Sequence, residues 1–221
     1  MITLYGAPRT RSTRVSWLLE ELGLTWQYHY INFAKGDSQH PDFLAINPSG
    51  KIPLLIDEDK TTPEACITLS ESAAICHFLI EKYNDTSNTP LYQPPKSSPD
   101  SARYHQWISF ITCELEQALW TLAKHKFALP KALRQESIQA VAIWEFDKAA
   151  NIAESWIPNS DYLFGNTLSI ADILLTHTLQ WATKAGMTLP PKLEQYRKKV
   201  ASRPALSRAL AKEEAEALRA A

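Results

Sequence analysis

The stretch from Asn47 to Ser72 limits the possible folds more than any other part of the sequence. It opens with the turn residues Asn-Pro-Ser-Gly at 47–50, followed by an apolar run that contains Pro53. Proline has no N–H for a sheet ladder, so this run is predicted to be an edge strand or the start of a strand. Such a strand leaves backbone groups free. A cis Ile52–Pro53 bond would turn the Ile52 backbone outward, where an extended, peptide-like ligand could pair with it.

The far end of this stretch is predicted to begin a helix. Ser70 stands at the expected N-cap position, and apolar residues follow at helical spacing: Ala74, Ile75, Phe78 and Leu79. Free N–H groups and the positive dipole end at a helix start attract a carboxylate. The strand and the helix start together predict a binding site for a small, extended, acidic peptide.

The composition is typical of a globular protein with a substantial core, since 45% of the 221 residues are apolar. The 23 basic residues balance 24 acidic ones for a net charge of −1, so the overall charge favours neither nucleic acid nor an anionic membrane as partner. No apolar stretch is long enough to span a bilayer and the N-terminus does not resemble a signal peptide, so a cytoplasmic location is expected. Three cysteines without paired spacing predict reduced thiols and no metal site.

Strands and helices are predicted to alternate along the first 83 residues. The expected elements are a strand over 2–5, a helix over 15–22, a strand over 26–33, an irregular helical loop over 35–45, a strand over 51–57, a turn at 58–60, a strand around 65–69 and a helix over 71–83. This β-α-β-α-β-β-α order matches a thioredoxin-like domain.

Residues 84–100 are rich in Asn, Asp, Ser, Thr and Pro, which is typical of a linker. Beyond them the chain is predicted to be all helical. Apolar residues recur at three- and four-residue spacing over 101–125, 131–157, 169–186, 190–202 and 204–220. The predicted fold is therefore α/β plus all-α, with an α/β domain at 1–83 and a helical domain at 101–221.

Ser169 and Asp172 in the helical half have the spacing of a capping box. In such a box the hydroxyl and the carboxylate satisfy N–H groups at the start of a helix. We therefore predict a role for Asp172 in folding and not in catalysis.

Several of these motifs together resemble one known family. Asn-Pro-x-Gly-Lys-x-Pro at 47–53, followed by Ser-Glu-Ser-x-Ala-Ile at 70–75, resembles the glutathione-binding half of cytosolic glutathione S-transferases. Ser-Ile-Ala-Asp at 169–172 and Arg-Pro-Ala at 203–205 resemble motifs of the helical domain of that family. The resemblance covers essentially the whole chain. It implies a thioredoxin-like domain followed by a helical domain, and assembly as a homodimer.

The resemblance also implies roles for individual residues in binding glutathione. Ile52, next to Pro53, would pair with the cysteinyl backbone of glutathione, and Lys51 would lie near its glycyl carboxylate. Glu71 and Ser72 would hold the γ-glutamyl end. No metal is implied.

The chemistry that the resemblance implies is activation of the glutathione thiol, whose free pKa is about 8.5. Lowering this pKa needs a hydroxyl or amide donor and the positive end of a helix, so the site is expected at 8–14, between the first strand and the first helix. Family members place Ser, Tyr or Cys four or five residues before the equivalent of Arg14, which leads here to Thr10 or Arg9. Thr10 is preferred and Ser12 is the alternative.

Two arginines of the same segment are further candidates. Arg9 and Arg11 would supply positive charge at the sulfur or bind an acidic co-substrate, although two arginines in a loop also suit a solvated surface. The electrophile site is expected between this loop and the helix at 101–125. Its candidate residues are Tyr104, His105 and Ile108, and further along Ile111 and Glu114, whereas Trp107 is expected in the core.

The leading functional hypothesis is an enzyme that transfers glutathione to a hydrophobic electrophile. The alternatives are a glutathione-dependent peroxidase or isomerase, or a non-catalytic regulatory or binding module of the same fold. The presence of Lys51, Pro53, Glu71 and Ser72 favours a working glutathione site over the non-catalytic module. The sequence has no Gly-rich phosphate loop and no Gly-x-Ser-x-Gly motif, so nucleotide-binding and serine-hydrolase functions are not supported.

Overall fold

The structure is a computed structural model that describes residues 1–58 and 66–220. The chain forms two compact units. Unit 1 comprises Met1–Leu91 together with Ser202–Ala221, and unit 2 comprises Tyr92–Ala201. The C-terminal residues, which were expected in the helical domain, are thus grouped with the N-terminal part, and the domain limits given above stay a prediction.

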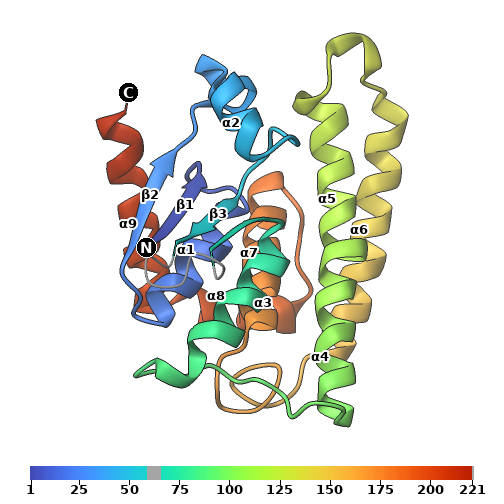
Figure 1. The fold of residues 1–221 in the computed structure, drawn as a ribbon. Coiled ribbons are helices and arrows are strands. Elements are labelled where there is room, and N and C mark those ends of the chain that lie inside the picture. Colours follow the sequence, from blue (N-terminus) through green and yellow to red (C-terminus); the bar gives the residue numbers. More distant parts are fainter. Residues whose placement is uncertain (59–65, 221) are drawn as a thin grey trace. The chain divides into compact units, whose positions relative to one another are not determined.

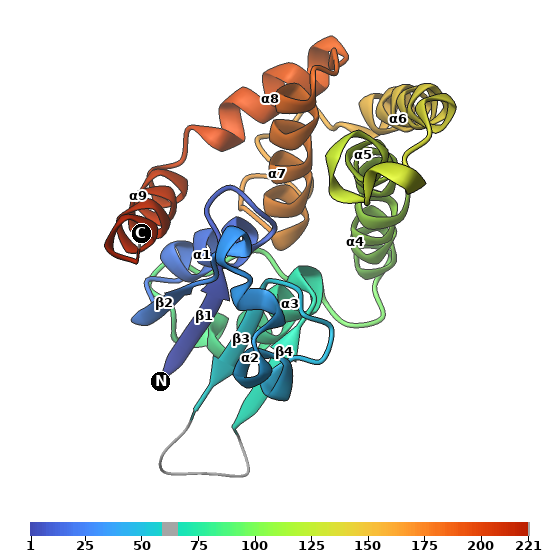
Figure 2. The same cartoon turned by 90° about the horizontal axis from the view of Figure 1, so that it is seen from above.

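Unit 1 is built on a four-stranded mixed sheet in the order β2-β1-β3-β4, as Figure 2 shows. The parallel pair β1 and β2 is the one expected for a strand–helix–strand unit, and β3 and β4 form an antiparallel hairpin beside it. The strands are β1 (Ile2–Gly6), β2 (Trp26–Tyr30), β3 (Leu54–Asp57) and β4 (Ile67–Ser70). This sheet and the helices of unit 1 confirm the thioredoxin-like fold that was predicted for the first half of the chain.

Four α-helices belong to unit 1, within the residues that the structure describes. They are α1 (Ser12–Glu21), α2 (Pro41–Ile46), α3 (Ser72–Tyr83) and α9 (Pro204–Arg219). Residues 12–19 of α1 are all buried, because this helix packs against β1, α3 and α9. Helix α1 therefore contacts both the sheet and α9, the last helix of the chain.

Several predicted boundaries in unit 1 were wrong. The helix predicted over 15–22 begins at Ser12, and the strand predicted over 51–57 begins at Leu54. The second strand ends at Tyr30 and not at residue 33, because Asn32 begins a 3-10 turn: its side-chain oxygen accepts the N–H groups of Ala34 and Lys35 at 3.0 and 3.3 Å. Ser70, predicted as an N-cap, is instead the last residue of β4 and pairs there with a residue of β3.

The N-cap of α3 is Glu71, with φ 70° and ψ 109°. The predicted turn at Glu58–Lys60 and the predicted strand start at Ala65 include residues outside the described ones, namely Asp59, Lys60 and Ala65.

Unit 2 is helical, as predicted. Its helices are α4 (Pro99–Phe110), α5 (Glu116–Ala123), α6 (Glu136–Trp156), α7 (Ile170–Ala185) and α8 (Pro191–Ala201). Helices α5 and α6 run side by side, as Figure 1 shows, and α7 forms the centre of the core because nearly its whole length is buried. The core of this unit is thus organised around α7.

Two helices of unit 2 differ from the predicted ranges. The helix predicted over 101–125 is interrupted by a π-helical segment, Ile111–Leu115. Within this segment the hydroxyl of Thr112 donates to the carbonyl of Ile108 at 2.9 Å, where it competes with the backbone N–H groups of the helix. The helix predicted over 131–157 begins only at Glu136. The preceding loop is held by Arg134, whose guanidinium donates to the carbonyl of Leu129 at 2.7 Å.

The predicted capping box at the start of α7 is confirmed. The Asp172 carboxylate accepts the N–H and the hydroxyl of Ser169 at 2.7 and 2.5 Å. It also accepts the N–H of Leu163 at 2.8 Å and the hydroxyl of Tyr196. Burial raises the pKa of this carboxyl. Asp172 thereby joins α7, the loop before it and α8.

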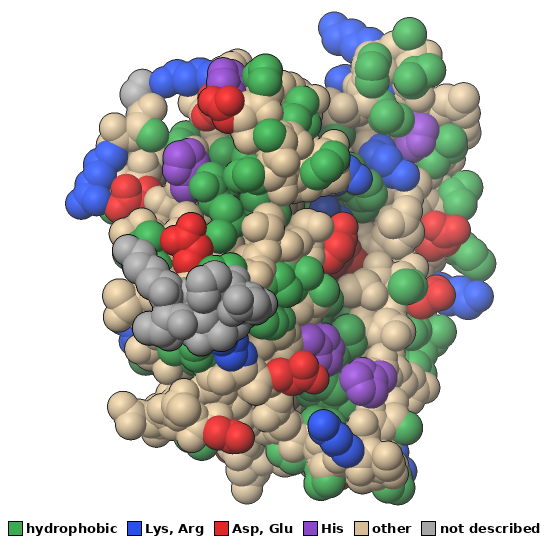
Figure 3. All heavy atoms as spheres, in the orientation of Figure 1, with side chains coloured by type: hydrophobic (Ala, Val, Ile, Leu, Met, Phe, Trp, Pro, Cys, Tyr) green, Lys and Arg blue, Asp and Glu red, His purple; other side chains and the backbone are tan. Residues whose placement is uncertain are grey.

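Charged side chains of both signs are interspersed over the face of the molecule that Figure 3 shows. This agrees with a composition in which 23 basic residues stand against 24 acidic ones. In the described part of the chain, no helix is long and apolar enough to cross a membrane. The described residues also include no cluster of three or more His, Cys, Asp or Glu side chains that would hold a metal ion.

Two buried glutamates join α1 to α9, one near each end of α1. Glu21 accepts two hydrogen bonds from the guanidinium of Arg203, at 2.6 and 2.7 Å. Glu213 accepts the hydroxyls of Thr13 and Ser16 at 2.9 and 2.5 Å, so its hydrogen-bond donors are neutral. Burial raises the pKa of the Glu213 carboxyl to about 7. Glu21 therefore forms an ion pair with Arg203, whereas Glu213 is a buried carboxyl group that is hydrogen-bonded to neutral donors.

Replacing Glu213 by glutamine should make the stability of the fold less dependent on pH. A carboxyl with a pKa of about 7 in the fold, against an ordinary value of 4.5, stabilises the fold fully below pH 4.5 and loses this contribution as the pH rises through 7. The difference between the two pKa values corresponds to about 3 kcal/mol. The charged neighbour of the carboxyl, Glu214, acts in the same direction.

Denaturant unfolding between pH 4.5 and 8.5 measures this effect. As the pH rises, the free energy of unfolding of Glu213→Gln should increase relative to that of wild type, by up to about 3 kcal/mol. The matched control is Glu21→Gln, which removes the other buried carboxylate between the same helices. A difference between Glu213→Gln and wild type that stays constant with pH would contradict the prediction.

Candidate functional site

The loop between β1 and α1 carries both predicted thiol-activating hydroxyls. The side-chain oxygens of Thr10 and Ser12 lie 2.8 Å apart. The Thr10 hydroxyl donates to the carbonyl of Ala7 at 2.8 Å, which uses its one proton, so Ser12 is the donor in the bond between the two side chains. Ser12 is fully buried, and Thr10 is partly exposed. The two candidates thus form one hydrogen-bonded pair, with Thr10 on the outside.

Gly6, the last residue of β1, allows Ser12 to lie directly against the strand. A Cβ atom at Gly6 would stand 2.5 Å from both the Cβ and the Oγ of Ser12, and 2.8 Å from the hydroxyl oxygen of Tyr28. Real Cβ atoms do not approach other atoms so closely. The position of the Ser12 hydroxyl therefore depends on a glycine at this point of the chain.

Arg9 has a left-handed backbone, with φ 61°. Its guanidinium pairs with Glu214 on α9 at 2.7 Å, and both side chains are largely exposed. Arg11 is the N-cap residue of α1, and its carbonyl accepts the N–H of Arg14 at 3.2 Å. The charge of Arg9, expected near the sulfur or an acidic co-substrate, is thus directed to a carboxylate of α9 in this structure.

The segment before β3 is a turn organised by Asn47, which is buried. Its side-chain amide donates to the carbonyl of Lys51 at 2.7 Å and accepts the hydroxyl of Ser49 at 2.8 Å. The peptide bond between Ile52 and Pro53 is cis. Pro53 is buried and the side chain of Lys51 is exposed. In the described part of the chain, the backbone of Ile52 has no hydrogen-bond partner.

The start of α3 carries the other predicted binding residues. Glu71 is exposed, and its left-handed backbone precedes the helix. Ser72, the first residue of α3, is buried, and its hydroxyl accepts a hydrogen bond from the guanidinium of Arg14 at 3.2 Å. The Ser72 hydroxyl is the acceptor in this bond and does not use its own proton for it. The proton can therefore be donated to another acceptor.

The register of the sheet places these three segments at the same end of unit 1. Tyr5 at the end of β1 pairs with Leu54 at the start of β3, and Leu54 pairs with Ser70 at the end of β4. The segments that follow β1, precede β3 and follow β4 therefore begin from one row of the sheet. They carry Arg9, Thr10, Ser12, Lys51, Ile52, Pro53, Glu71 and Ser72.

Arg14 and Glu213 also contact the segments of this site, although no role was predicted for them from the sequence. Arg14 is fully buried on α1 and contacts Ser72. Several other residues of α1 are polar too, so the local sequence does not single out Arg14. Glu213 contacts the β1–α1 segment through the N–H of Arg9 at 3.4 Å, as well as through α1 itself. No local pattern in the sequence indicates this contact, because the two residues are far apart along the chain.

The three predicted electrophile-site residues lie on α4 in unit 2. Tyr104 and Ile108 are buried and His105 is exposed. The ring of Tyr104 lies 5.6 Å from that of Phe164, so it takes part in the packing of the unit. Trp107, predicted to be in the core, is buried. The role of Tyr104, His105 and Ile108 in binding an electrophile stays a prediction.

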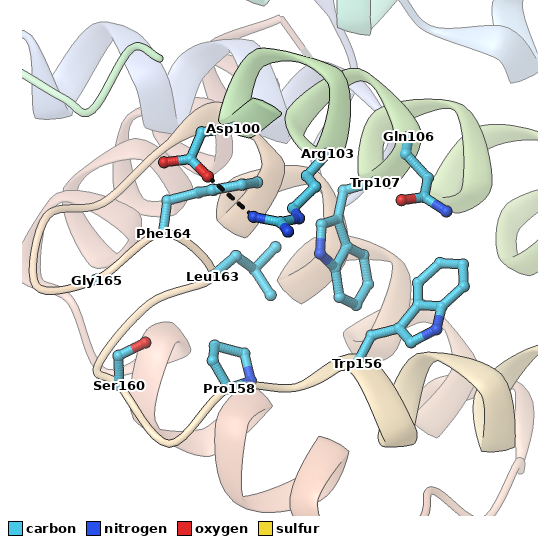
Figure 4. Close-up of a pocket in the computed structure, with 10 residues that line it drawn as sticks. All are labelled: Asp100, Arg103, Gln106, Trp107, Trp156, Pro158, Ser160, Leu163, Phe164 and Gly165. Carbon is cyan, nitrogen blue, oxygen red and sulfur yellow. Dashed lines mark hydrogen bonds and ion pairs between the residues drawn. The ribbon is translucent and has the colours of Figure 1, made fainter. Parts of the chain in front are cut away.

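Unit 2 also contains a pocket of about 540 Å³, shown in Figure 4. Trp107 and Arg103 of α4 reach into it from one side, and Trp156 and Phe164 contribute aromatic walls. Arg103 forms an ion pair with Asp100 at 3.3 Å. None of the three predicted electrophile-site residues is among the residues that line this pocket.

Comparisons with known proteins match both halves of the chain to the same family. Residues 10–82 match the family model described as glutathione S-transferase, N-terminal domain, and residues 115–204 match that of the C-terminal domain. The disulfide-bond oxidoreductase YfcG of Escherichia coli is 28% identical over 214 residues, which are 96% of this chain and 95% of that protein. The glutathione S-transferase-like protein gedE of Aspergillus terreus is 29% identical over 184 residues, or 78% and 74% of the two chains.

Among solved structures, the glutathione transferase URE2P6 of Phanerochaete chrysosporium, in complex with oxidised glutathione, has a similar fold. It superposes with a TM-score of 0.80 and 24% identity, and the match covers 97% of each chain. At this level of identity the likeness shows the fold.

Replacing Gly6 by alanine should displace Ser12 and destabilise unit 1. The added Cβ meets the Cβ and Oγ of Ser12 and the hydroxyl oxygen of the buried Tyr28, so strand and helix have to separate, at a cost of about 1–3 kcal/mol. Denaturant unfolding of Gly6→Ala measures this loss. The control is Gly23→Ala, at a position where nothing lies within 4 Å of an added Cβ and only the left-handed backbone is disfavoured. A Gly6→Ala protein as stable as wild type would contradict the tight contact.

Proposed function

Because the chain belongs to the cytosolic glutathione S-transferase family, we propose that it is a glutathione transferase that activates the glutathione thiol for attack on a hydrophobic electrophile. The observation that carries the proposal is the convergence of the β1–α1, Asn47–Pro53 and Glu71–Ser72 segments at one end of the sheet. One segment offers hydroxyl donors, the second offers a free backbone, and the third offers the start of a helix.

We assign the ends of glutathione from the charges of these segments. The γ-glutamyl carboxylate would accept hydrogen bonds from the Ser72 hydroxyl and the free N–H groups at the start of α3, and Arg14 directs the Ser72 proton toward it. The exposed carboxylate of Glu71 would pair with the γ-glutamyl ammonium group. The backbone of Ile52 would pair with the cysteinyl residue, and the ammonium group of Lys51 with the glycyl carboxylate.

The thiol of a tripeptide bound in this way would lie near the start of α1. We assign Thr10 as the donor to the sulfur, because its hydroxyl is partly exposed; when glutathione binds, its proton would turn from the carbonyl of Ala7 to the sulfur. We assign Ser12 as the positioning residue of Thr10, because Ser12 is buried and donates to Thr10. A hydrogen bond and the positive end of α1 both favour the thiolate over the thiol. The thiolate then attacks the electrophilic carbon, a C–S bond forms, and the leaving group departs with its bonding electrons.

A second candidate function is thiol–disulfide exchange with glutathione. It is favoured by the similarity to YfcG, which extends over nearly the whole chain and whose name describes a disulfide-bond oxidoreductase. In this reaction the same thiolate attacks a disulfide sulfur, an S–S bond to glutathione forms, and the other sulfur leaves as a thiolate. The two functions use the same bound thiolate and differ in its acceptor.

The decisive experiment is a calorimetric titration with reduced glutathione, followed on the same sample by a chromogenic aryl-halide conjugation assay. Binding with turnover supports the transferase. Binding without conjugation, but with reduction of a small mixed disulfide or a peroxide, or with isomerisation of a substrate, moves the function to that reaction. No binding would contradict the proposal and favour a non-catalytic module.

Replacing Ser72 by alanine should weaken glutathione binding by about 1–2 kcal/mol, or roughly 5- to 30-fold in Kd. The substitution removes a charge-assisted hydrogen bond to a carboxylate, and it also removes one acceptor of the buried Arg14 guanidinium. Calorimetry measures the change. Ser87→Ala is the matched control, since the Ser87 hydroxyl donates to the carbonyl of Leu22 and accepts the N–H of Thr89, both in the same unit. Unchanged affinity in Ser72→Ala would remove this residue from the site.

Replacing Thr10 by alanine should raise the pKa of the bound glutathione thiol by about one to two units, because the hydrogen bond that stabilises the thiolate is lost. Thiolate absorbance against pH measures this pKa. Thr10→Ser keeps the hydroxyl and should stay close to wild type, while Ser12→Ala should produce a smaller rise. If Ser12→Ala raises the pKa and Thr10→Ala does not, Ser12 is the donor.

A further inference from the structure

We propose that Glu213 on α9 is a positioning residue for the β1–α1 segment, which it holds so that the Thr10 hydroxyl faces the thiol of bound glutathione. The part of this inference that concerns the thiol rests on the proposed function. The part that concerns the loop rests on contacts within unit 1 alone. Glu213 would thereby make the last helix of the chain a component of the site.

Both carboxylate oxygens of Glu213 are engaged by the start of α1 and the segment before it. One oxygen accepts the hydroxyl of Ser16 at 2.5 Å, and the other accepts the hydroxyl of Thr13 at 2.9 Å and the N–H of Arg9 at 3.4 Å. These donors lie on either side of Thr10 in the sequence. A single carboxylate therefore links the residue before Thr10 to the helix that begins after it.

The backbone of Arg9 explains why such a link is needed. A left-handed conformation, φ 61°, is disfavoured for a residue with a side chain and persists where its surroundings hold it. Glu213 holds the N–H of Arg9, and the adjacent Glu214 holds its guanidinium at 2.7 Å. Since Thr10 follows directly, the dihedral angles of Arg9 set the direction in which the Thr10 side chain points.

Helix α9 is itself fixed to the sheet beside this contact. The ammonium group of Lys212 donates to the carbonyl of Trp26 at 2.6 Å and lies 3.8 Å from the centre of the Trp26 ring. Figure 1 shows α9 alongside β2. A helix attached to an outer strand thus presents Glu213 to the β1–α1 segment from a defined position.

Packing alone would not require a polar residue at this position. Glu213 is fully buried and its donors are neutral, and burial raises the pKa of its carboxyl to about 7. An ionisable group in such surroundings is unfavourable for stability compared with an apolar residue. Glu21, the other buried acid between α1 and α9, has Arg203 as its partner and lies at the opposite end of α1. The two residues provide a matched pair for a test.

The first measurement uses the free protein and needs no glutathione. Amide hydrogen exchange of residues 9–13 is compared among wild type, Glu213→Ala and Glu21→Gln. Glu213→Ala should exchange about tenfold faster in this segment, because the acceptor of the Arg9 N–H is lost, and Glu21→Gln should match wild type there. Equal exchange in Glu213→Ala and wild type, or equal acceleration in both variants, would overturn the proposal.

The second measurement is the pKa of the bound glutathione thiol, from thiolate absorbance against pH. Glu213→Ala should raise this pKa by about one unit, with less than about a threefold change in the Kd for glutathione. Glu213→Gln keeps the size and one acceptor oxygen and should remain near wild type. A shift in Glu213→Gln as large as in Glu213→Ala would assign the effect to charge and overturn the positioning role.

The two measurements separate failure of this inference from failure of the proposed function. If wild type binds no glutathione, the proposed function fails and the exchange result still decides whether Glu213 holds the loop. If wild type binds and the exchange and thiol pKa of Glu213→Ala both match wild type, only the present inference fails. Should Glu213→Ala not fold, Glu213→Asp, which is shorter by one methylene group, replaces it with the same expected directions.

Discussion

The candidate site depends on the pairing of three strands along one row of the sheet. Leu54 lies between Tyr5 on one side and Ser70 on the other, so the end of β1, the start of β3 and the end of β4 share one edge of unit 1. Backbone hydrogen bonds set this register, and the buried faces of the strands prevent a one-residue slip that would turn every side chain over. Segments that are distant in sequence thereby bring a hydroxyl, a free backbone and a helix start to the same edge of the sheet.

Buried polar contacts then determine the detailed geometry around this row. Gly6 allows the Ser12 hydroxyl to lie against β1, and Arg14 directs its guanidinium to Ser72 across the helices of unit 1. Each contact couples a group that would face the ligand to a group that does not. Buried donors and acceptors with few alternatives have one favourable arrangement, which is the condition for a preorganised site. The contact of Glu213 with the β1–α1 segment belongs to the same set.

Family membership by itself does not select one reaction for this chain. The relatives include a protein named as a transferase-like enzyme and one named as a disulfide-bond oxidoreductase, at nearly equal identity to this chain. Both kinds of reaction begin from a thiolate of glutathione. In the segment proposed to face the sulfur, this chain has Thr10 and Ser12 and no cysteine between residues 7 and 14. A hydroxyl donor stabilises a thiolate without entering the reaction covalently, which suits transfer of glutathione to a second substrate.

The amino-acid sequence by itself determined the fold class, the order of strands and helices in the first half, the capping box at Ser169 and the segments in which the predicted binding residues lie. These follow from local patterns: hydrophobic period, turn residues and short motifs. Tertiary structure decided the rest. It placed Ser70 in β4 instead of at a helix N-cap, because strand pairing took precedence over a local capping preference. It also brought Glu213 to the start of α1, since a contact between residues some 200 positions apart depends on packing of whole helices and leaves no periodic signal in the chain.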